Sequence, residues 1–292
     1  MSVFEGTGVA LVTPFTGKGA VDYDALRKLV RYQVDNGTDF LVVQGTTGET
    51  ATLTIEEKEK VLTTVIQEND GALKVVLGLA GNNTAATVTA FQEFDRDGVD
   101  GFLTASPHYN KPSQEGVFQH FKALSEATKL PIILYNVPGR TGSNVTAQTT
   151  LRLAALENIV AVKEASGNLE QVMEIIQHAP KGFKVLLGED ALTMPMIAAG
   201  AHGVISVVAN AFPKRFSKMV KASRAGDLKT ARKEHYALLS ITHLFFAEGN
   251  PSGVKASLKA QGIMQEYLRL PLTMVTDALR SKIVEETEKL VG

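Results

Sequence analysis

The sequence contains no cysteine among its 292 residues. This absence excludes disulfide bonds, thiolate nucleophiles and sulfur-ligated zinc or iron–sulfur centres. The sequence also lacks an excess of either charge, since 30 lysines and arginines stand against 31 aspartates and glutamates. Without a basic run, we expect neither nucleic acid nor an anionic membrane surface as a partner. No apolar stretch approaches about 18 residues, and no basic and apolar leader opens the sequence, so we expect a cytoplasmic protein without a membrane span.

The patterns that signal cofactors and metals are missing as well. No G-x-G-x-x-G follows the first predicted strand, and the turn at 45–49 lacks the Gly-Lys-Ser/Thr ending of a Walker loop. The six histidines are scattered singly, and only His108 falls at a predicted strand exit. A metal-dependent aldolase or hydrolase needs clustered histidine or carboxylate ligands. We therefore expect a protein without a cofactor or a metal.

What the sequence does contain is an alternation of short β-branched runs with longer amphipathic stretches. The runs predict eight strands, near residues 8–14, 40–45, 74–80, 101–105, 131–137, 159–165, 183–188 and 203–208. Helical patterns begin between them near residues 22, 54, 84, 113, 146, 168, 192 and 213, and several open on Ser, Thr or Asn as N-caps. Units of about 30 residues favour an α/β fold of the (β/α)8 TIM-barrel type, and a doubly wound open sheet is the alternative.

The strand signals stop after residue 225. Three helical patterns follow, over 227–247, 251–261 and 273–290. We therefore interpret residues 1–225 as the (β/α)8 catalytic barrel and residues 226–292 as a C-terminal helical domain.

Polar residues gather where the predicted strands end, which is the catalytic face of such a barrel. The second strand runs into Gly-Thr-Thr-Gly-Glu at 45–49, whose N–H groups and hydroxyls suit a small carboxylate, although such a sequence is more often only a turn. The fourth strand runs into 106–112, where two prolines frame His108 and Tyr109 and a rigid connector is the simpler interpretation. The fifth runs into 135–142, where Arg140 suits bidentate capture of a carboxylate.

Two acids follow the seventh predicted strand, in Gly188-Glu189-Asp190. Phosphate-binding barrels use the loops after their last two strands, and two carboxylates there would repel a phosphate. The sequence therefore disfavours a phosphorylated substrate.

The sixth predicted strand, 159–165, contains a lysine at position 163. Strands of a parallel barrel are buried on both faces, and burial lowers the pKa of a lysine. The neutral amine that results can attack a carbonyl group. The alternative is a lysine at a frayed strand end that reaches water or pairs with Glu164. The tyrosines and the arginine expected nearby favour a nucleophilic Lys163.

Three segments together carry a resemblance to a known family. Gly45-Thr46-Thr47-Gly48-Glu49, Tyr135-Asn136-Val137-Pro138 and Lys163 occur in the order and at the intervals typical of the dihydrodipicolinate synthase and N-acetylneuraminate lyase superfamily. The resemblance extends over the whole chain. It implies a lyase in which Lys163 forms a Schiff base with pyruvate.

The resemblance also implies roles for other residues. Tyr135 would pass protons to and from the intermediate, with Thr46 and Tyr109 as its relay partners. In the family the tyrosine equivalent to Tyr109 is lent across a tight dimer interface, so dimers, usually paired into tetramers, would be the working form. Thr47 would help to hold the pyruvate carboxylate through its backbone, and Ile205 would line the same pocket.

Position 140 bears on the substrate. An arginine here resembles the synthase branch, because neuraminate lyases usually carry another residue. The resemblance thus implies condensation of pyruvate with L-aspartate-4-semialdehyde, with Arg140 holding the carboxylate of the aldehyde and Gly188 in the substrate pocket. Another pyruvate-dependent aldolase, acting on neuraminate or a keto-deoxy-sugar acid, is the runner-up. A barrel that binds a small molecule without catalysis is a further alternative, which the complete set of site residues disfavours.

One departure from the family concerns regulation. Members of the family that are inhibited by lysine bind it with a glutamate and a histidine. The matching positions here are Ala86 and Ile55. His108 stands where a tyrosine is common, although Asn82 is retained. We therefore expect weak or no inhibition by lysine.

Overall fold

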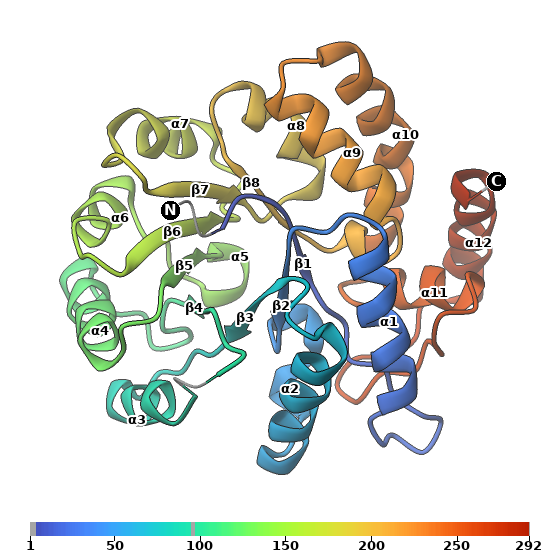
Figure 1. Ribbon diagram of the computed structural model, residues 1–292, viewed down its shortest axis with the longest axis horizontal. Helices are drawn as coiled ribbons and strands as arrows, with labels where there is room; N and C mark the ends of the chain where they lie inside the picture. The colour runs from blue at the N-terminus through green and yellow to red at the C-terminus, as the bar shows by residue number, and fades with distance from the viewer. Residues whose placement is uncertain (1–3, 95–96, 292) are drawn as a thin grey trace.

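Eight parallel strands form a closed barrel in the computed structural model, which describes residues 4–94 and 97–291 (Figure 1). Each strand pairs with its neighbours in sequence, and the first pairs with the last. The strands are β1 (Gly6–Ala10), β2 (Phe40–Val43), β3 (Lys74–Gly78), β4 (Gly101–Ala105), β5 (Ile132–Asn136), β6 (Ile159–Glu164), β7 (Lys184–Leu187) and β8 (Gly203–Ser206). The barrel prediction is confirmed, and the pairing of β1 with β8 excludes the open-sheet alternative.

The first strand lies differently from its prediction. We expected it over 8–14, whereas β1 begins at Gly6 and ends at Ala10. Beyond Ala10 the N–H of Val12 donates to the side chain of Asn210 at 3.1 Å. The Val12 N–H is therefore bound to Asn210, almost 200 positions away, and is not available to continue the strand pairing.

The helices surround the barrel and begin close to the predicted residues (Figure 1). The barrel helices are α1 (Tyr23–Asp35), α2 (Ile55–Asn69), α3 (Thr84–Phe94), α4 (Gln114–Ala127), α5 (Pro138–Thr141), α6 (Ala147–Leu153), α7 (Leu169–His178), α8 (Thr193–Ala198) and α9 (Pro213–Arg224). Local caps explain this accuracy. At α2, for example, Thr54 accepts from the Glu57 N–H at 3.2 Å while Glu57 accepts from the Thr54 N–H at 3.0 Å, which forms a capping box.

Three further helices follow the barrel, as predicted: α10 (Leu228–Phe246), α11 (Ser252–Ala260) and α12 (Asp277–Val291). Helix α10 packs against α9, and α11 contacts both α10 and α12. The division of the chain at residue 225 falls between α9 and α10, and we keep it as a proposal. Among the described residues, no helix combines the length and the apolar character needed to span a bilayer.

Two apolar cores fill the space outside and inside the barrel. An outer core packs the helices against the outside of the strands. An inner core fills the barrel and includes Phe4, Phe40, Val76, Ile133, Leu186 and Ile205. Because the interior is packed, a ligand is accommodated at the mouth, where the carboxyl ends of the strands open into loops.

Closure of the barrel gives a first prediction. Gly203 of β8 pairs with Gly6 of β1, and a Cβ at Gly203 would clash with the Gly6 carbonyl oxygen and lie 2.6 Å from its amide nitrogen. We expect Gly203→Ala to lower the free energy of unfolding by about 1–3 kcal/mol in urea titrations, because backbone must shift. Gly139→Ala is the control, since no atom lies within 4 Å of the added Cβ. Equal stability of the two variants would contradict this account.

Candidate active site

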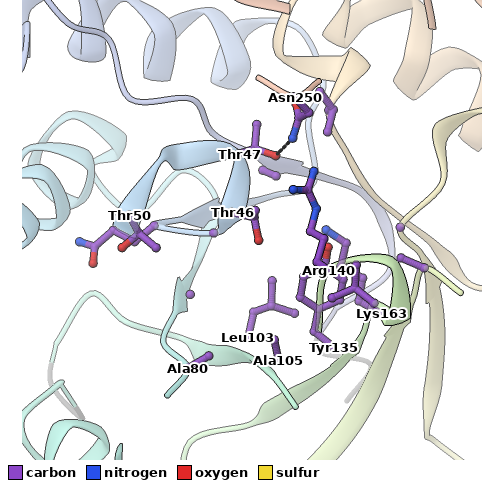
Figure 2. A pocket seen from close by; sticks show the side chains of 18 of the residues that line it. Thr46, Thr47, Thr50, Ala80, Leu103, Ala105, Tyr135, Arg140, Lys163 and Asn250 are labelled. Atoms are coloured by element: carbon purple, nitrogen blue, oxygen red, sulfur yellow. Dashed lines mark hydrogen bonds between the residues drawn. The ribbon is translucent and has the colours of Figure 1, made fainter. Parts of the chain in front are cut away.

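A cavity of about 420 Å³ opens at the carboxyl ends of the strands. Figure 2 shows side chains that line it, which include residues of the loop after β2, of β4, of β5 and its loop, of β6 and of the segment after α10. Six of the eight predicted site residues line it, namely Thr46, Thr47, Tyr135, Arg140, Lys163 and Gly188. The structure therefore brings together residues that lie up to 142 positions apart in the sequence.

Lys163 lies in β6 with only 6% of its surface exposed. It pairs in register with Tyr135 of β5, and its Nζ lies 4.4 Å from the centroid of the Tyr135 ring. Burial lowers the pKa of Lys163 to about 8, although the Asp190 carboxylate opposes the shift. An appreciable fraction of the amine is therefore neutral near neutral pH, which is the form able to attack a carbonyl.

Gly188, which directly follows β7, leaves the space that the lysine needs. A Cβ at this position would lie 3.0 Å from Cε of Lys163 and 2.6 Å from Cβ of Ala165. Any larger residue would clash with Ala165 and crowd the lysine side chain. The glycine is thus explained by close approach of a side chain, not by an unusual backbone conformation.

Tyr135 presents a phenol to the same cavity. Burial raises its pKa to about 12, while the Arg140 guanidinium and the Thr46 side chain act in the opposite direction. The phenol is therefore protonated at neutral pH and can donate a proton or a hydrogen bond. Arg140 lies on α5, exposed at the mouth of the cavity.

The loop after β2 contributes backbone and hydroxyl groups. Thr46–Gly48 form a short 3-10 turn, which ends at Glu49 in the left-handed conformation with φ 53°. The Gly48 carbonyl accepts from the Thr13 hydroxyl at 2.7 Å, and the buried Thr47 hydroxyl accepts from Asn250 Nδ2 at 2.9 Å (Figure 2). The loop is thereby held from both sides.

Two acids lie beside the lysine. Asp190 is buried, and its Oδ2 accepts from the backbone N–H groups of Val207 and Val208 at 3.0 and 3.1 Å. Burial raises the pKa of Asp190 to about 6, and burial also raises that of Glu189, which lines the cavity. From the sequence these acids indicate only repulsion of a phosphate, and their proximity to Lys163 is seen only in the folded chain.

A buried polar network supports the strand that carries the lysine. The carboxylate of Glu164 accepts from Asn136 Nδ2 at 3.0 and 3.1 Å, from Gln171 Nε2 at 2.9 Å and from the Ser166 N–H at 2.8 Å. Glu164 therefore faces away from Lys163 and fixes the end of β6. The alternative pairing of Lys163 with Glu164, considered from the sequence, is not found.

Two predicted site residues do not line the cavity. Ile205 is fully buried in the inner core of the barrel. Tyr109 is 90% exposed with φ 63°, and its N–H donates to the Thr141 carbonyl at 3.3 Å. The backbone of the neighbouring His108 is held by two hydrogen bonds with the Asn82 side chain, at 2.7 and 2.9 Å. Within one chain, the tyrosine therefore projects away from the barrel surface.

Sequence reasoning missed the contribution of the C-terminal segment. Phe246 and Asn250 line the cavity, and Asn250 is buried. The sequence offered only Gly249-Asn250-Pro251 as a break between helices, which carries no sign of a contact with residue 47. Among the residues that the structure describes, no group of three or more His, Asp or Glu side chains is placed to hold a metal ion.

Comparisons with known proteins agree with this geometry. A model of the dihydrodipicolinate synthetase family matches residues 3–290. The 4-hydroxy-tetrahydrodipicolinate synthase of Phocaeicola vulgatus is 52% identical over 269 residues, which are 92% of this chain and 91% of that protein. That of Parabacteroides distasonis is 50% identical over 98% of this chain and 97% of its own. The crystal structure of dihydrodipicolinate synthase from Aquifex aeolicus is 42% identical, with a TM-score of 0.94 and 98% of both chains covered. The resemblance inferred from the sequence is confirmed, and the chain belongs to the dihydrodipicolinate synthetase family.

Proposed function

We propose that this protein is a 4-hydroxy-tetrahydrodipicolinate synthase, which condenses pyruvate with L-aspartate-4-semialdehyde in lysine and diaminopimelate biosynthesis. The two similar bacterial proteins described above carry this name, and their similarity extends over nearly the full length of the chain. The observation that carries the proposal is the buried Lys163 amine, with its pKa lowered to about 8 beside the phenol of Tyr135. This arrangement suits a lyase that works through a lysine Schiff base.

The chemistry begins with the lysine. The neutral Nζ of Lys163 attacks the keto carbon of pyruvate, water leaves, and a protonated imine forms. The imine is an electron sink, so the pyruvate methyl group loses a proton and becomes an enamine. The enamine carbon attacks the aldehyde carbon of the second substrate and regenerates the imine. The amino group of that substrate then attacks the imine carbon, closes the ring and displaces Lys163.

Each of these steps moves a proton, and Tyr135 is the proposed donor and acceptor. General acid–base help of this kind contributes typically about 10²–10⁴-fold to the rate. Thr46, which lines the same cavity, is the proposed first partner in this relay. Tyr109 is the proposed second partner. Tyr109 is exposed in the single chain. In the proposed homodimer or homotetramer, it would enter the cavity of a neighbouring protomer.

The substrate carboxylates need separate partners. We assign the pyruvate carboxylate to the backbone of the loop around Thr47, with Gly188 leaving room beside the imine. We assign the carboxylate of the aldehyde to Arg140, since guanidinium suits bidentate contact with a carboxylate. Ile205 would contribute from the packed floor below the cavity.

Weak or absent inhibition by lysine stays a prediction. Ile55 opens α2 and is 79% exposed, and Ala86 lies in the first turn of α3. Neither side chain offers a charge to an amino-acid effector.

Reductive trapping tests the proposed function. We expect borohydride in the presence of pyruvate to give a stable adduct that maps to Lys163, and we expect Lys163→Met to abolish it. Lys255 is an internal control, because it is also buried with a pKa lowered to about 8 but does not line the cavity. No adduct in the wild-type protein, or an adduct on Lys255 instead, would overturn the mechanism.

The pH dependence of trapping gives a second test. The neutral amine accumulates as pH rises through its pKa, so we expect the initial trapping rate to rise with a midpoint near pH 8. The Asp190 carboxylate raises the pKa of Lys163, and Asp190→Asn is therefore expected to move the midpoint to lower pH. Asp227→Asn, which keeps a capping oxygen far from the cavity, is the control. A midpoint unchanged by Asp190→Asn would remove this carboxylate from the account.

Substitution of Arg140 separates the two substrates. We expect Arg140→Ala to form the pyruvate adduct but to lower kcat/KM for the aldehyde about 10–100-fold, because a charged hydrogen-bonding partner is lost. Arg152→Ala is the control, since Arg152 pairs with Glu115 at 2.9 Å outside the cavity. Equal kinetics of the two variants in a steady-state assay would exclude Arg140 from aldehyde binding.

A further inference from the structure

The loop at 45–49 is anchored by residues more than 200 positions away, in the segment between α10 and α12. Its last residue, Glu49, is buried, and its Oε1 lies 2.5 Å from Nζ of Lys255 on α11, with both side chains fully shielded from solvent. The same ammonium donates to the carbonyl groups of Thr13 at 2.7 Å and Tyr267 at 2.9 Å. One buried cation thus joins three separate segments of chain.

Arg269 reinforces this anchor through its backbone and its side chain. The second carboxylate oxygen of Glu49 accepts from the backbone N–H of Arg269 at 3.2 Å. The Arg269 guanidinium donates to the Thr52 carbonyl at 2.7 Å and to both oxygens of Glu57 at 2.5 and 2.6 Å. It therefore ties the loop to the start of α2 as well.

A further contact lies at the wall of the cavity. Asn250 Nδ2 donates to the Thr47 hydroxyl at 2.9 Å, and Figure 2 shows this hydrogen bond at the edge of the site. On its cavity side the loop presents Thr46, which lines the cavity together with Tyr135. The position of Thr47 is thereby coupled to a group outside the barrel, and Thr46 is its neighbour in the same turn.

We propose that Lys255 is a positioning residue for the substrate site, because its contacts hold the loop Gly45–Glu49 in the conformation that receives the carboxylate of the keto acid. This inference rests on the proposed function. Lys255 does not line the cavity and touches no substrate. It acts through Glu49, whose left-handed backbone conformation is uncommon for a residue other than glycine and needs such support.

The alternative is that the buried pair only stabilises the fold. A structural role predicts loss of stability on substitution, with normal pyruvate binding in the molecules that remain folded. A positioning role predicts a change in pyruvate binding in the folded protein. Loss of good geometry in one hydrogen bond to a charged group weakens binding by about 10–100-fold, so the effect is measurable.

The test compares Lys255→Met with Lys259→Met in the full chain. Lys259 lies one turn later on α11 and binds Glu266 at 2.7 Å, away from the loop. For Lys255→Met we expect the pyruvate concentration that gives half-maximal borohydride trapping to rise about 10–100-fold, while the adduct at saturation still maps to Lys163. KM for pyruvate is expected to rise with it, and kcat to change much less. Lys259→Met is expected to match the wild-type protein.

A double variant separates positioning from stability. Lys255→Met combined with Glu49→Gln removes both buried charges, so thermal stability should recover relative to Lys255→Met alone, since no unpaired charge remains buried. The raised half-saturation for pyruvate should persist. If Lys255→Met does not fold, Glu49→Gln alone keeps the side-chain length and is expected to raise the same value.

Two outcomes would overturn the inference. The first is a folded Lys255→Met or Glu49→Gln variant whose pyruvate concentration for half-maximal trapping equals that of the wild-type protein. The second is a double variant that recovers both thermal stability and pyruvate binding. The proposed function fails in a different way. If the wild-type protein itself forms no adduct with pyruvate, the Schiff-base mechanism is wrong, whatever the variants do.

Discussion

Burial of a single amine is the constraint on which the site depends. A lysine inside a parallel barrel must lose most of its hydration, and this lowers the pKa of Lys163 from 10.5 to about 8. The shift corresponds to roughly 3 kcal/mol in favour of the neutral form. At pH 7 about one amine in ten is then neutral, against about one in three thousand for an exposed lysine. By exclusion of water, the fold thus provides the neutral amine that the proposed mechanism needs at Lys163.

The same burial acts in the opposite direction on the neighbouring phenol. It raises the pKa of Tyr135 to about 12, which keeps the proton on the phenol while the amine loses its own. Two groups in register on adjacent strands therefore differ in protonation in the sense that acid–base chemistry requires. Asp190 limits the effect, because its negative field favours a cation at Lys163. Such a field also stabilises the protonated imine that the proposed mechanism requires.

The sequence predicted the parts of this architecture that are encoded locally. Strands followed from β-branched runs, helix starts from caps such as Thr54, and Lys163 was singled out because it interrupts an apolar strand. The predicted end of β1 was wrong because Asn210, which follows the neighbouring strand β8 but lies almost 200 positions away in sequence, accepts from the Val12 N–H. The contribution of Asn250 was missed for the same reason, since its partner Thr47 is about 200 residues away. Contacts of this kind leave no periodic pattern, so only the folded chain reveals them.

The charged pair of Glu49 and Lys255 joins the loop after β2 to helix α11. Buried ion pairs contribute little stability relative to well-packed apolar residues, because desolvation offsets the attraction. An apolar residue at position 255, however, could not donate to the carbonyl groups of Thr13 and Tyr267. The lysine satisfies backbone acceptors from two segments and orients the carboxylate of a third. In the proposed positioning role, the physical advantage of this pair is orientation of the substrate loop.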